Sequence, residues 1–435
     1  MNKWALYAGI AVLAIIIVAS IIYIEYIATE ANTIVGVHIN TNGQTFNYKY
    51  SNVSAYAISG SNNNFTFSAY RLLSNSSNES SNLFFSPFSA FVVMSMAAEG
   101  AGGQTALQMY NGLNLSENLS ENHNGFASIL SSLSGKNSGY SLSIADALWI
   151  EKTYPFEQSF LNVLNDYYNA TAYPADFINN SNEAGSAINS WVANKTYGAI
   201  QNLIPNGTLN PSTRAVLVNA IYFHGMWAQK FNKANTTSQN FYVNKSSTVS
   251  VPMMYQQVNA SYYGNSTLQA LELDYNDSNV TMLILLPTNS SRIEQVQNRL
   301  SVRSISIIKS NAIITPVRVW LPRFNITEYT DMKQMFISLG MNDAFSRNAN
   351  FSKMSDISGL YLSDALQEAF IQVDENGTTA AAATAAIVQP TVVGLNLNPH
   401  PVVFRADHPF IFFIIDRRSG AILFMGRISD PATAS

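Results

Sequence analysis

Histidines are the residues in this chain best suited to catalysis or metal binding, and their spacing supports neither role. No pair stands in an HExxH or other metal-ligand spacing, and there is no cysteine for a thiolate site, a disulfide or a nucleophile. The nucleophile-elbow, phosphate-loop and dinucleotide-binding motifs are also missing. The sequence therefore predicts no metal and no cofactor, and it disfavours an enzyme. The five histidines are His38, His123, His224, His400 and His408.

One histidine has a neighbouring carboxylate. His408 follows Asp407 in "ADHPF". The members of a Ser-His-Asp triad meet only in space, so the sequence leaves a triad, and with it an anchored hydrolase, open. A pair that stabilises a turn before a buried strand is the simpler interpretation.

The whole chain is rich in apolar residues and poor in charge. Of its 435 residues, 47% are hydrophobic and 11% are charged, and the net charge is −4. Lysine and arginine nowhere cluster, which argues against nucleic acid, an anionic membrane surface or a heparin-type cofactor as a partner.

The N-terminal residues predict the compartment. The segment Trp4–Ile24 is uncharged and long enough to span a bilayer as a helix, with Lys3 before it and Glu25 after it. The positive-inside rule then places the rest of the chain outside the cytoplasmic membrane. We expect a signal anchor at 1–27 and an Asn/Ser/Thr-rich stalk at 28–64. A cleaved signal peptide and a secreted protein are the alternative. An external chain could be glycosylated at its many N-x-S/T sequons.

The globular part is expected at 65–435, as one α+β domain. Apolar periodicity predicts a helix, a glycine break and a second helix over 89–113, and an amphipathic helix that ends near Tyr197. Apolar runs predict buried strands. These runs are 213–223, 279–287, 365–373, 409–416 and 421–428.

The tract "DENGTTAAAATAA", 374–386, is unusual because almost every side chain after the glycine is small and none is charged. It lies between the apolar runs 365–373 and 409–416. Such a tract can lie in solvent, and it can also become a central strand, because alternate side chains would then enter a packed interior without burying a charge.

Several motifs, taken in order, resemble those of the serpin family over about residues 65–430. They include "NLFFSPFSAFVVMSMAAEGAGGQTALQM", "VLVNAIYFHGMWAQKF", "LPRFNITEYTDMKQMFISLGMNDAF" and "FRADHPFIFFIIDRRSGAILFMGRISDP". The resemblance implies a serpin fold. This fold has a large, mainly antiparallel sheet A, two further sheets, about eight to nine helices and an exposed reactive centre loop, here about 375–403. A membrane-anchored prokaryotic-type member fits the N-terminal segment.

The resemblance also implies a mechanism, in which a protease cuts the loop and is trapped covalently while the loop enters sheet A. The partner would be a serine or cysteine protease, and the inhibitor would be a monomer. A non-inhibitory serpin acting as a surface or binding protein is the alternative, although members of that kind typically carry bulky or charged hinges. The hinge residues implied here are Glu375, Gly377, Thr378, Thr379, Ala380, Ala381, Ala382 and Ala383.

Two counts place the scissile bond differently. The family's usual spacing from Glu375 gives Thr391–Val392, whereas counting back from Pro409 gives Asn398, so the loop is about seven residues longer than usual. We favour the first count, because insertion length governs the trap. None of the candidates is Arg or Lys, which favours an elastase- or subtilisin-like target. The other candidates are Val393, Gly394, Leu395 and Asn396.

Two further sets of residues are implied by the resemblance. The polar cluster under sheet A that governs strand separation, called the shutter, would comprise Ser86, Ser89, Asn219 and Gln367. Gln367 stands where the family has histidine, and glutamine does not titrate near pH 6, so we expect a cluster that is insensitive to pH. Trp227 would cover the place where the loop begins to enter the sheet, called the breach.

Overall fold

The computed structural model describes residues 33–39, 45–77, 81–134, 140–276, 279–289, 293–378 and 401–433. Within these ranges the chain forms nine α-helices and two 3-10 turns, η1 (Lys233–Asn235) and η3 (Asp343–Phe345). The α-helices are α2 (Asn52–Ser76), α3 (Pro87–Glu99), α4 (Gly103–Leu113), α5 (Leu119–Ser134), α6 (Gln158–Tyr168), α7 (Phe177–Lys195), α8 (Ile293–Gln297), α9 (Val302–Asn311) and α10 (Lys333–Ser338).

The described strands form three sheets, of two, nine and six strands. The strands are β1 (Thr33–Ile39), β2 (Thr45–Ser51), β3 (Leu83–Phe85), β4 (Tyr140–Glu151), β5 (Ala172–Ala175), β6 (Ala215–Met226), β7 (Thr237–Tyr242), β8 (Thr248–Gly264), β9 (Leu268–Asp274), β10 (Val280–Pro287), β11 (Ile313–Pro322), β12 (Phe324–Asp331), β13 (Leu362–Asp374), β14 (Gly377–Thr378), β15 (Val402–Arg405), β16 (Phe410–Asp416) and β17 (Ile422–Ile428).

The six-stranded sheet, sheet A, has the order β12-β13-β14-β6-β4-β5. Its two central long strands, β13 and β6, run parallel and pair from Leu362↔Ala215 to Phe370↔Tyr222. Most other neighbours in the sheet are antiparallel, as expected from the sequence. A parallel central pair matters because an added strand between the two can be antiparallel to both.

The nine-stranded sheet differs in one respect from the expectation of two further sheets. The long strand β8 pairs with β7 from Thr248 to Met253, with β11 from Met253 to Tyr262, and with β9 from Ser261 to Gly264. Because these pairings share one strand, the two expected sheets form a single continuous path, β15-β11-β8-β9-β10-β16-β17-β3. The predicted hairpin at the C-terminus is present as β16 and β17.

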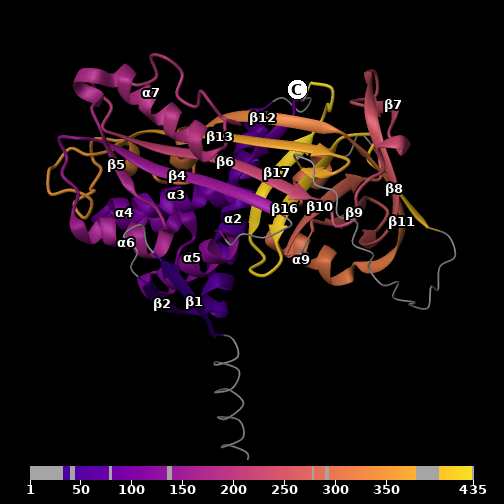
Figure 1. Ribbon diagram of the computed structural model, residues 1–435, viewed down its shortest axis with the longest axis horizontal. Coiled ribbons are helices and arrows are strands. Elements are labelled where there is room, and N and C mark those ends of the chain that lie inside the picture. Colours follow the sequence, from indigo (N-terminus) through magenta and orange to yellow (C-terminus); the bar gives the residue numbers. More distant parts are fainter. Residues whose placement is uncertain are drawn as a thin grey trace, which may run out of the picture.

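Two cores lie against the opposite faces of sheet A. The larger core includes α3, almost every residue of which is buried, together with the helices and the nine-stranded sheet on that side. The smaller core lies beneath α7, which crosses the other face (Figure 1). There Ile188 and Val192 of α7 pack with Val216 and Val218 of β6 and with Leu366 of β13.

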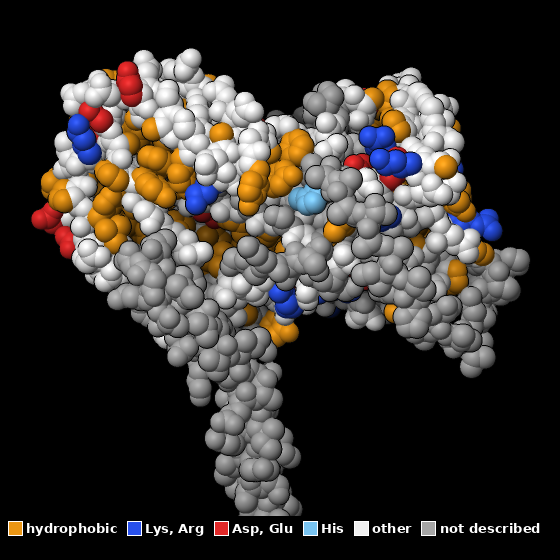
Figure 2. Space-filling model, in the orientation of Figure 1, with side chains coloured by type: hydrophobic (Ala, Val, Ile, Leu, Met, Phe, Trp, Pro, Cys, Tyr) orange, Lys and Arg blue, Asp and Glu red, His pale blue; other side chains and the backbone are white. Residues whose placement is uncertain are grey.

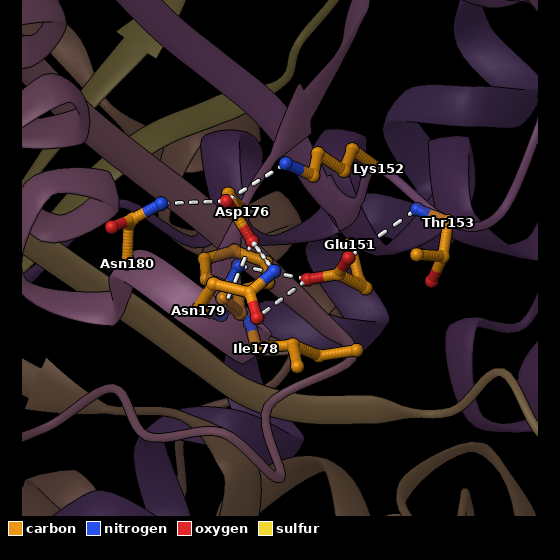
Figure 3. Close-up of polar contacts among 8 residues, drawn as sticks. Glu151, Lys152, Thr153, Asp176, Ile178, Asn179 and Asn180 are labelled. Carbon is orange, nitrogen blue, oxygen red and sulfur yellow. Dashed lines mark hydrogen bonds and ion pairs between the residues drawn. The ribbon is translucent and has the colours of Figure 1, made fainter.

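The N-terminus of α7 is held on the end of β4 (Figure 3). Oε2 of the buried Glu151, the last residue of β4, accepts hydrogen bonds from the backbone N–H groups of Phe177 (2.8 Å) and Ile178 (3.1 Å). Asp176 caps the helix by accepting from the N–H of Asn179, and it also pairs with Lys152 at 2.8 Å. Free N–H groups at a helix N-terminus favour carboxylates, so these contacts fix α7 to β4.

The start of the globular part differs from the sequence prediction. Strands β1 and β2 form a hairpin, and α2 begins at Asn52, so the last part of the predicted 28–64 stalk is helical and this helix runs across the predicted boundary at Phe65. Buried positions recur along α2 at Ala55, Ile58, Asn62 and Phe65. The buried Asn62, whose side chain donates to Ile422 O, interrupts this apolar period and conceals the helix in the sequence.

The described residues include no helix that is both long and apolar enough to cross a bilayer. The predicted anchor, 1–27, lies outside those residues. On the face shown in Figure 2, charged side chains are few beside the hydrophobic and other uncharged ones.

Candidate functional site

Sheet A is open at one end, and the start of the predicted hinge occupies the opening. Beyond the pair Phe370↔Tyr222, β13 and β6 diverge, and β14 lies between them. Thr378 pairs with Val373 of β13 and with Gly225 of β6, antiparallel to both. The two residues of β14 therefore already form the beginning of an additional central strand.

Gly377 fits this position because it has no side chain. Its φ of +148° is a conformation that L side chains rarely adopt. A Cβ at this position would lie 2.0 Å from the carbonyl oxygen of Gly225 and 2.6 Å from Cα of Met226. These atoms belong to the backbone of β6, so they cannot move aside as a flexible side chain could.

Thr378 points into the larger core. Its side chain is fully buried, and its hydroxyl lies 2.9 Å from the hydroxyl of Tyr275. The ring of Tyr275 stacks on Trp227, with 4.6 Å between ring centroids. Because side chains alternate along a strand, an extended continuation of β14 would direct every second residue after Thr378 to the same side.

Trp227 and Glu375 hold the turn between β13 and β14. The indole N–H of Trp227 donates to the carbonyl of Asp374 at 2.9 Å, and its backbone N–H donates to Asn376 O. The buried Glu375 accepts a hydrogen bond from Thr236 at 2.8 Å and lies 3.8 Å from Nε of the partly exposed Arg323. The predicted breach residue therefore contacts the turn that contains Glu375, the first predicted hinge residue.

The four predicted shutter residues meet beneath β6 and β13. Gln367 of β13 accepts from the N–H of Ser86 and donates to the carbonyl of the same residue, both at 2.9 Å. It also donates to Asn219 of β6, which in turn donates to Ser89. The side-chain bond between Gln367 and Asn219 crosses the line along which β13 and β6 would separate.

A fifth member of this cluster, Asp146 of β4, was missed in the sequence. Its Oδ1 accepts hydrogen bonds from Ser89 (2.7 Å) and Asn219. Burial raises the pKa of Asp146 to about 7, although the hydrogen bonds from Ser89 and Asn219 oppose the rise. The cluster thus contains a titratable group near neutrality, contrary to the expectation based on Gln367. The sequence did contain a signal for this residue: in "SLSIADALWI" Asp146 stands in the same alternating register as Leu142 and Ile144, which predicts that it faces the same side of the strand.

We expect the Asp146 carboxyl to make stability depend on pH. Its pKa is higher in the folded state than its ordinary value near 3.8, so the folded chain takes up a proton between about pH 7 and pH 4. Acidification through this window therefore favours the folded state. Asp146→Asn should remove that component and stabilise the protein at about pH 8 by about 1–3 kcal/mol.

Urea denaturation of the wild type and of Asp146→Asn across this pH range measures the effect. The exposed Asp356 provides the matched control, Asp356→Asn. A stability difference between wild type and Asp146→Asn that stays constant with pH would contradict the assignment.

Other predicted residues lie elsewhere or outside the described part. Each ring nitrogen of His408 has a partner, Asp407 Oδ1 at 2.9 Å and the carbonyl of Pro287 at 2.7 Å, which agrees with a turn-stabilising pair rather than a triad.

Among the hinge residues, Thr379, Ala380, Ala381, Ala382 and Ala383 lie outside the described residues. So do all candidates for the scissile bond, namely Thr391, Val392, Val393, Gly394, Leu395 and Asn396.

The geometry defines a class of protein: one in which a short strand of the chain lies between two parallel strands at the end of its main sheet. Comparison with known proteins identifies the family. The family model described as "Serpin (serine protease inhibitor)" matches residues 60–431. The chain belongs to the serpin family, and its fold is the serpin fold.

Relatives and solved structures agree with this assignment. An uncharacterised serpin-like protein of Thermococcus kodakarensis is 39% identical, over 85% of this chain and 84% of the relative. A leukocyte elastase inhibitor of Xenopus laevis is 35% identical, over 86% and 99%. The crystal structure of human thyroxine-binding globulin in complex with thyroxine has a TM-score of 0.78 and 30% identity, over 87% of this chain and 99% of that chain. The family is one of protease inhibitors rather than enzymes, and these names show that it also includes a binding protein.

Proposed function

We propose that this chain is a suicide inhibitor of serine or cysteine endopeptidases, which it traps covalently while its cut loop enters sheet A between β6 and β13. The observation that carries the proposal is β14. Gly377 and Thr378 already pair with both neighbours at the point where the two strands diverge. Strand addition is the mode of recognition for which serpin loop insertion is itself a standing example.

The gain in free energy favours further insertion. From Phe370↔Tyr222 to Leu362↔Ala215, β13 and β6 are joined by one ladder of backbone hydrogen bonds. A strand inserted between them would replace this ladder with two. The net gain is about one hydrogen bond per inserted residue, or about 1 kcal/mol each. A dozen residues would supply on the order of 10 kcal/mol, comparable with the stability of a whole domain. That is enough to deform a bound protease.

The residues that follow suit this path. Thr378 faces the core, so the inward positions of a continued strand would be Ala380, Ala382, Thr384 and Ala386. All are small and uncharged. Side chains of this kind can enter a packed interior without the cost of burying a charge. This composition favours an inhibitor over the alternative, a non-inhibitory binding serpin.

We infer the target protease and the location of the inhibitor from residues outside the described part of the structure, for which only the sequence is informative. Cleavage at Thr391–Val392, or at the later candidates up to Asn396, requires a protease that accepts small or aliphatic residues, such as an elastase- or subtilisin-like enzyme. The segment 1–27 would anchor the inhibitor, as a monomer, outside the cytoplasmic membrane.

Incubation of the full-length chain with a panel of serine and cysteine proteases tests the proposal. We expect a covalent complex that survives SDS with at least one elastase- or subtilisin-like enzyme, and mass spectrometry should place the cut within 390–396. Trypsin-like enzymes should form no complex. Clean cleavage by every protease, with no complex and no rise in thermal stability of the cut chain, would support the non-inhibitory alternative instead.

A further inference from the structure

Two aromatic side chains, here called the ring pair, meet where sheet A begins to open. They are Tyr222 of β6 and Phe370 of β13, which face each other as the last pair of the parallel ladder before β14. Their rings are stacked, with 6.2 Å between centroids and 9° between planes. The next residues, Phe223 and Ile371, are buried in the larger core, so the ring pair lies on the opposite face of the sheet, the one that α7 crosses.

A third ring lies against this pair. Tyr197 follows α7, and its ring centroid is 6.3 Å from that of Tyr222, with 65° between the planes. The φ of Tyr197 is +55°, a left-handed conformation that strains an L side chain. Three rings therefore lie in a row, from the end of α7 across β6 to β13.

The register of β14 indicates which residue of an entering strand would meet the ring pair. Thr378 lies opposite Gly225 of β6 and opposite Val373 of β13. In the same antiparallel register, residue 381 would lie opposite both members of the ring pair, and the two neighbouring strands give the same answer. Residue 381 is an alanine outside the described residues. The ring pair is thus the first closed pair that an entering strand would have to separate.

We propose that the ring pair holds β6 and β13 together in the uncut protein and sets the rate at which the cut loop enters sheet A. The inference rests on the proposed function, because only a loop that enters the sheet has to separate the rings. Neighbouring strands lie about 4.8 Å apart, so a strand between β6 and β13 would hold their backbones about 10 Å apart. Aromatic rings interact at centroid separations of about 4.5–7 Å, so the stacking would be lost. The stacking therefore stabilises the closed sheet alone.

The position of the ring pair makes it a barrier to insertion. It must separate before the rest of the ladder can open, whereas the hydrogen bonds of the inserted strand form only afterwards. Removing a contact that is present in the closed sheet and absent when the sheet opens should speed the opening. A loop that enters sooner leaves the protease less time to complete its reaction and dissociate, so more of it is trapped.

Amide exchange of the uncut, full-length chain tests whether the rings hold the strands together. Tyr222→Leu and Phe370→Leu each remove one ring and keep an apolar side chain. Each should raise exchange at residues 220–222 and 368–370 by about three- to tenfold, the effect expected for one ring pair. Tyr222→Phe keeps the ring and should match the wild type. The matched control is Tyr329→Leu, which removes an exposed ring from β12, on the far side of β13 from β6.

The double variant Tyr222→Leu/Phe370→Leu distinguishes a contact between the rings from two independent changes. Because either single substitution already removes the stacking, the double variant should exceed each single variant by less than about twofold. The single variants should also raise the first-order rate of covalent-complex formation at saturating protease by about three- to tenfold. Tyr329→Leu should leave this rate unchanged.

Each result supports or overturns the inference. Exchange that does not rise in the single variants, or effects that multiply in the double variant, would show that the rings do not hold the strands together. Faster exchange without faster complex formation would overturn their role in insertion. If the wild type forms no covalent complex with any protease, the proposed function fails together with that role, and the exchange rates still decide whether the rings close the sheet.

Discussion

Replacing Gly377 with alanine should expel β14 from sheet A and lower the free energy of unfolding by about 2–3 kcal/mol. The positive φ alone disfavours an L side chain by about 1–2 kcal/mol. The new Cβ would also lie 2.0 Å from the carbonyl oxygen of Gly225, so either β6 shifts or β14 leaves. Urea denaturation measures the loss, and faster amide exchange at residues 377 and 378 would show that β14 has left.

Gly207 provides a matched control for this substitution. It has a φ of +83°, but a Cβ there would meet nothing within 4 Å. Gly207→Ala therefore carries the backbone strain without the collision and should cost no more than about 1–2 kcal/mol. Equal losses for the two variants would mean that Gly377 does not approach β6 as described.

Thr378→Arg should convert the proposed inhibitor into a substrate. Thr378 is fully buried between β6 and β13, where its hydroxyl lies 2.9 Å from that of Tyr275. An arginine there would bury an unpaired charge at a cost of several kcal/mol, so the cut loop could not remain in the sheet. The fraction of protease recovered as covalent complex should fall at least about tenfold, while cleavage of the loop continues.

Thr327→Arg is the control for that variant. Thr327 lies on the neighbouring strand β12 and is exposed, so the same change adds a charge without burying it. Complex formation should then match the wild type. Undiminished trapping by Thr378→Arg would show that the loop does not enter through β14.

The elements found from the sequence are those whose apolar pattern is continuous. The runs that became β6, β10, β13, β16 and β17 are buried along most of their length, so composition alone marks them as strands. The helix over 52–64 was missed because a buried asparagine takes an apolar position within it. Its tertiary partner, the carbonyl of Ile422, is 360 residues away and cannot be inferred locally.

In the candidate site, too, some residues were found from the sequence and others were not. The tract's composition indicated which residues could enter a sheet, and the resemblance grouped the four shutter residues that the structure brings together. Neither the composition nor the resemblance pointed to Asp146, because its role depends on the side chains that surround it in the folded protein. A single carboxylate in an apolar strand could equally face solvent, and only packing decides whether it is buried and what its pKa becomes.

The attachment of α7 determines how sheet A can divide. The helix is tied to the end of β4 through Glu151, and its apolar face packs mainly on β4 and β6, with Leu366 as its contact on β13. When β6 and β13 separate, we expect α7 to move with β4 and β6 and to lose its contact with Leu366 of β13. Division would have to break the ladder of backbone hydrogen bonds between β6 and β13 and the side-chain hydrogen bond between Gln367 and Asn219, while α7 stays folded on β4 and β6.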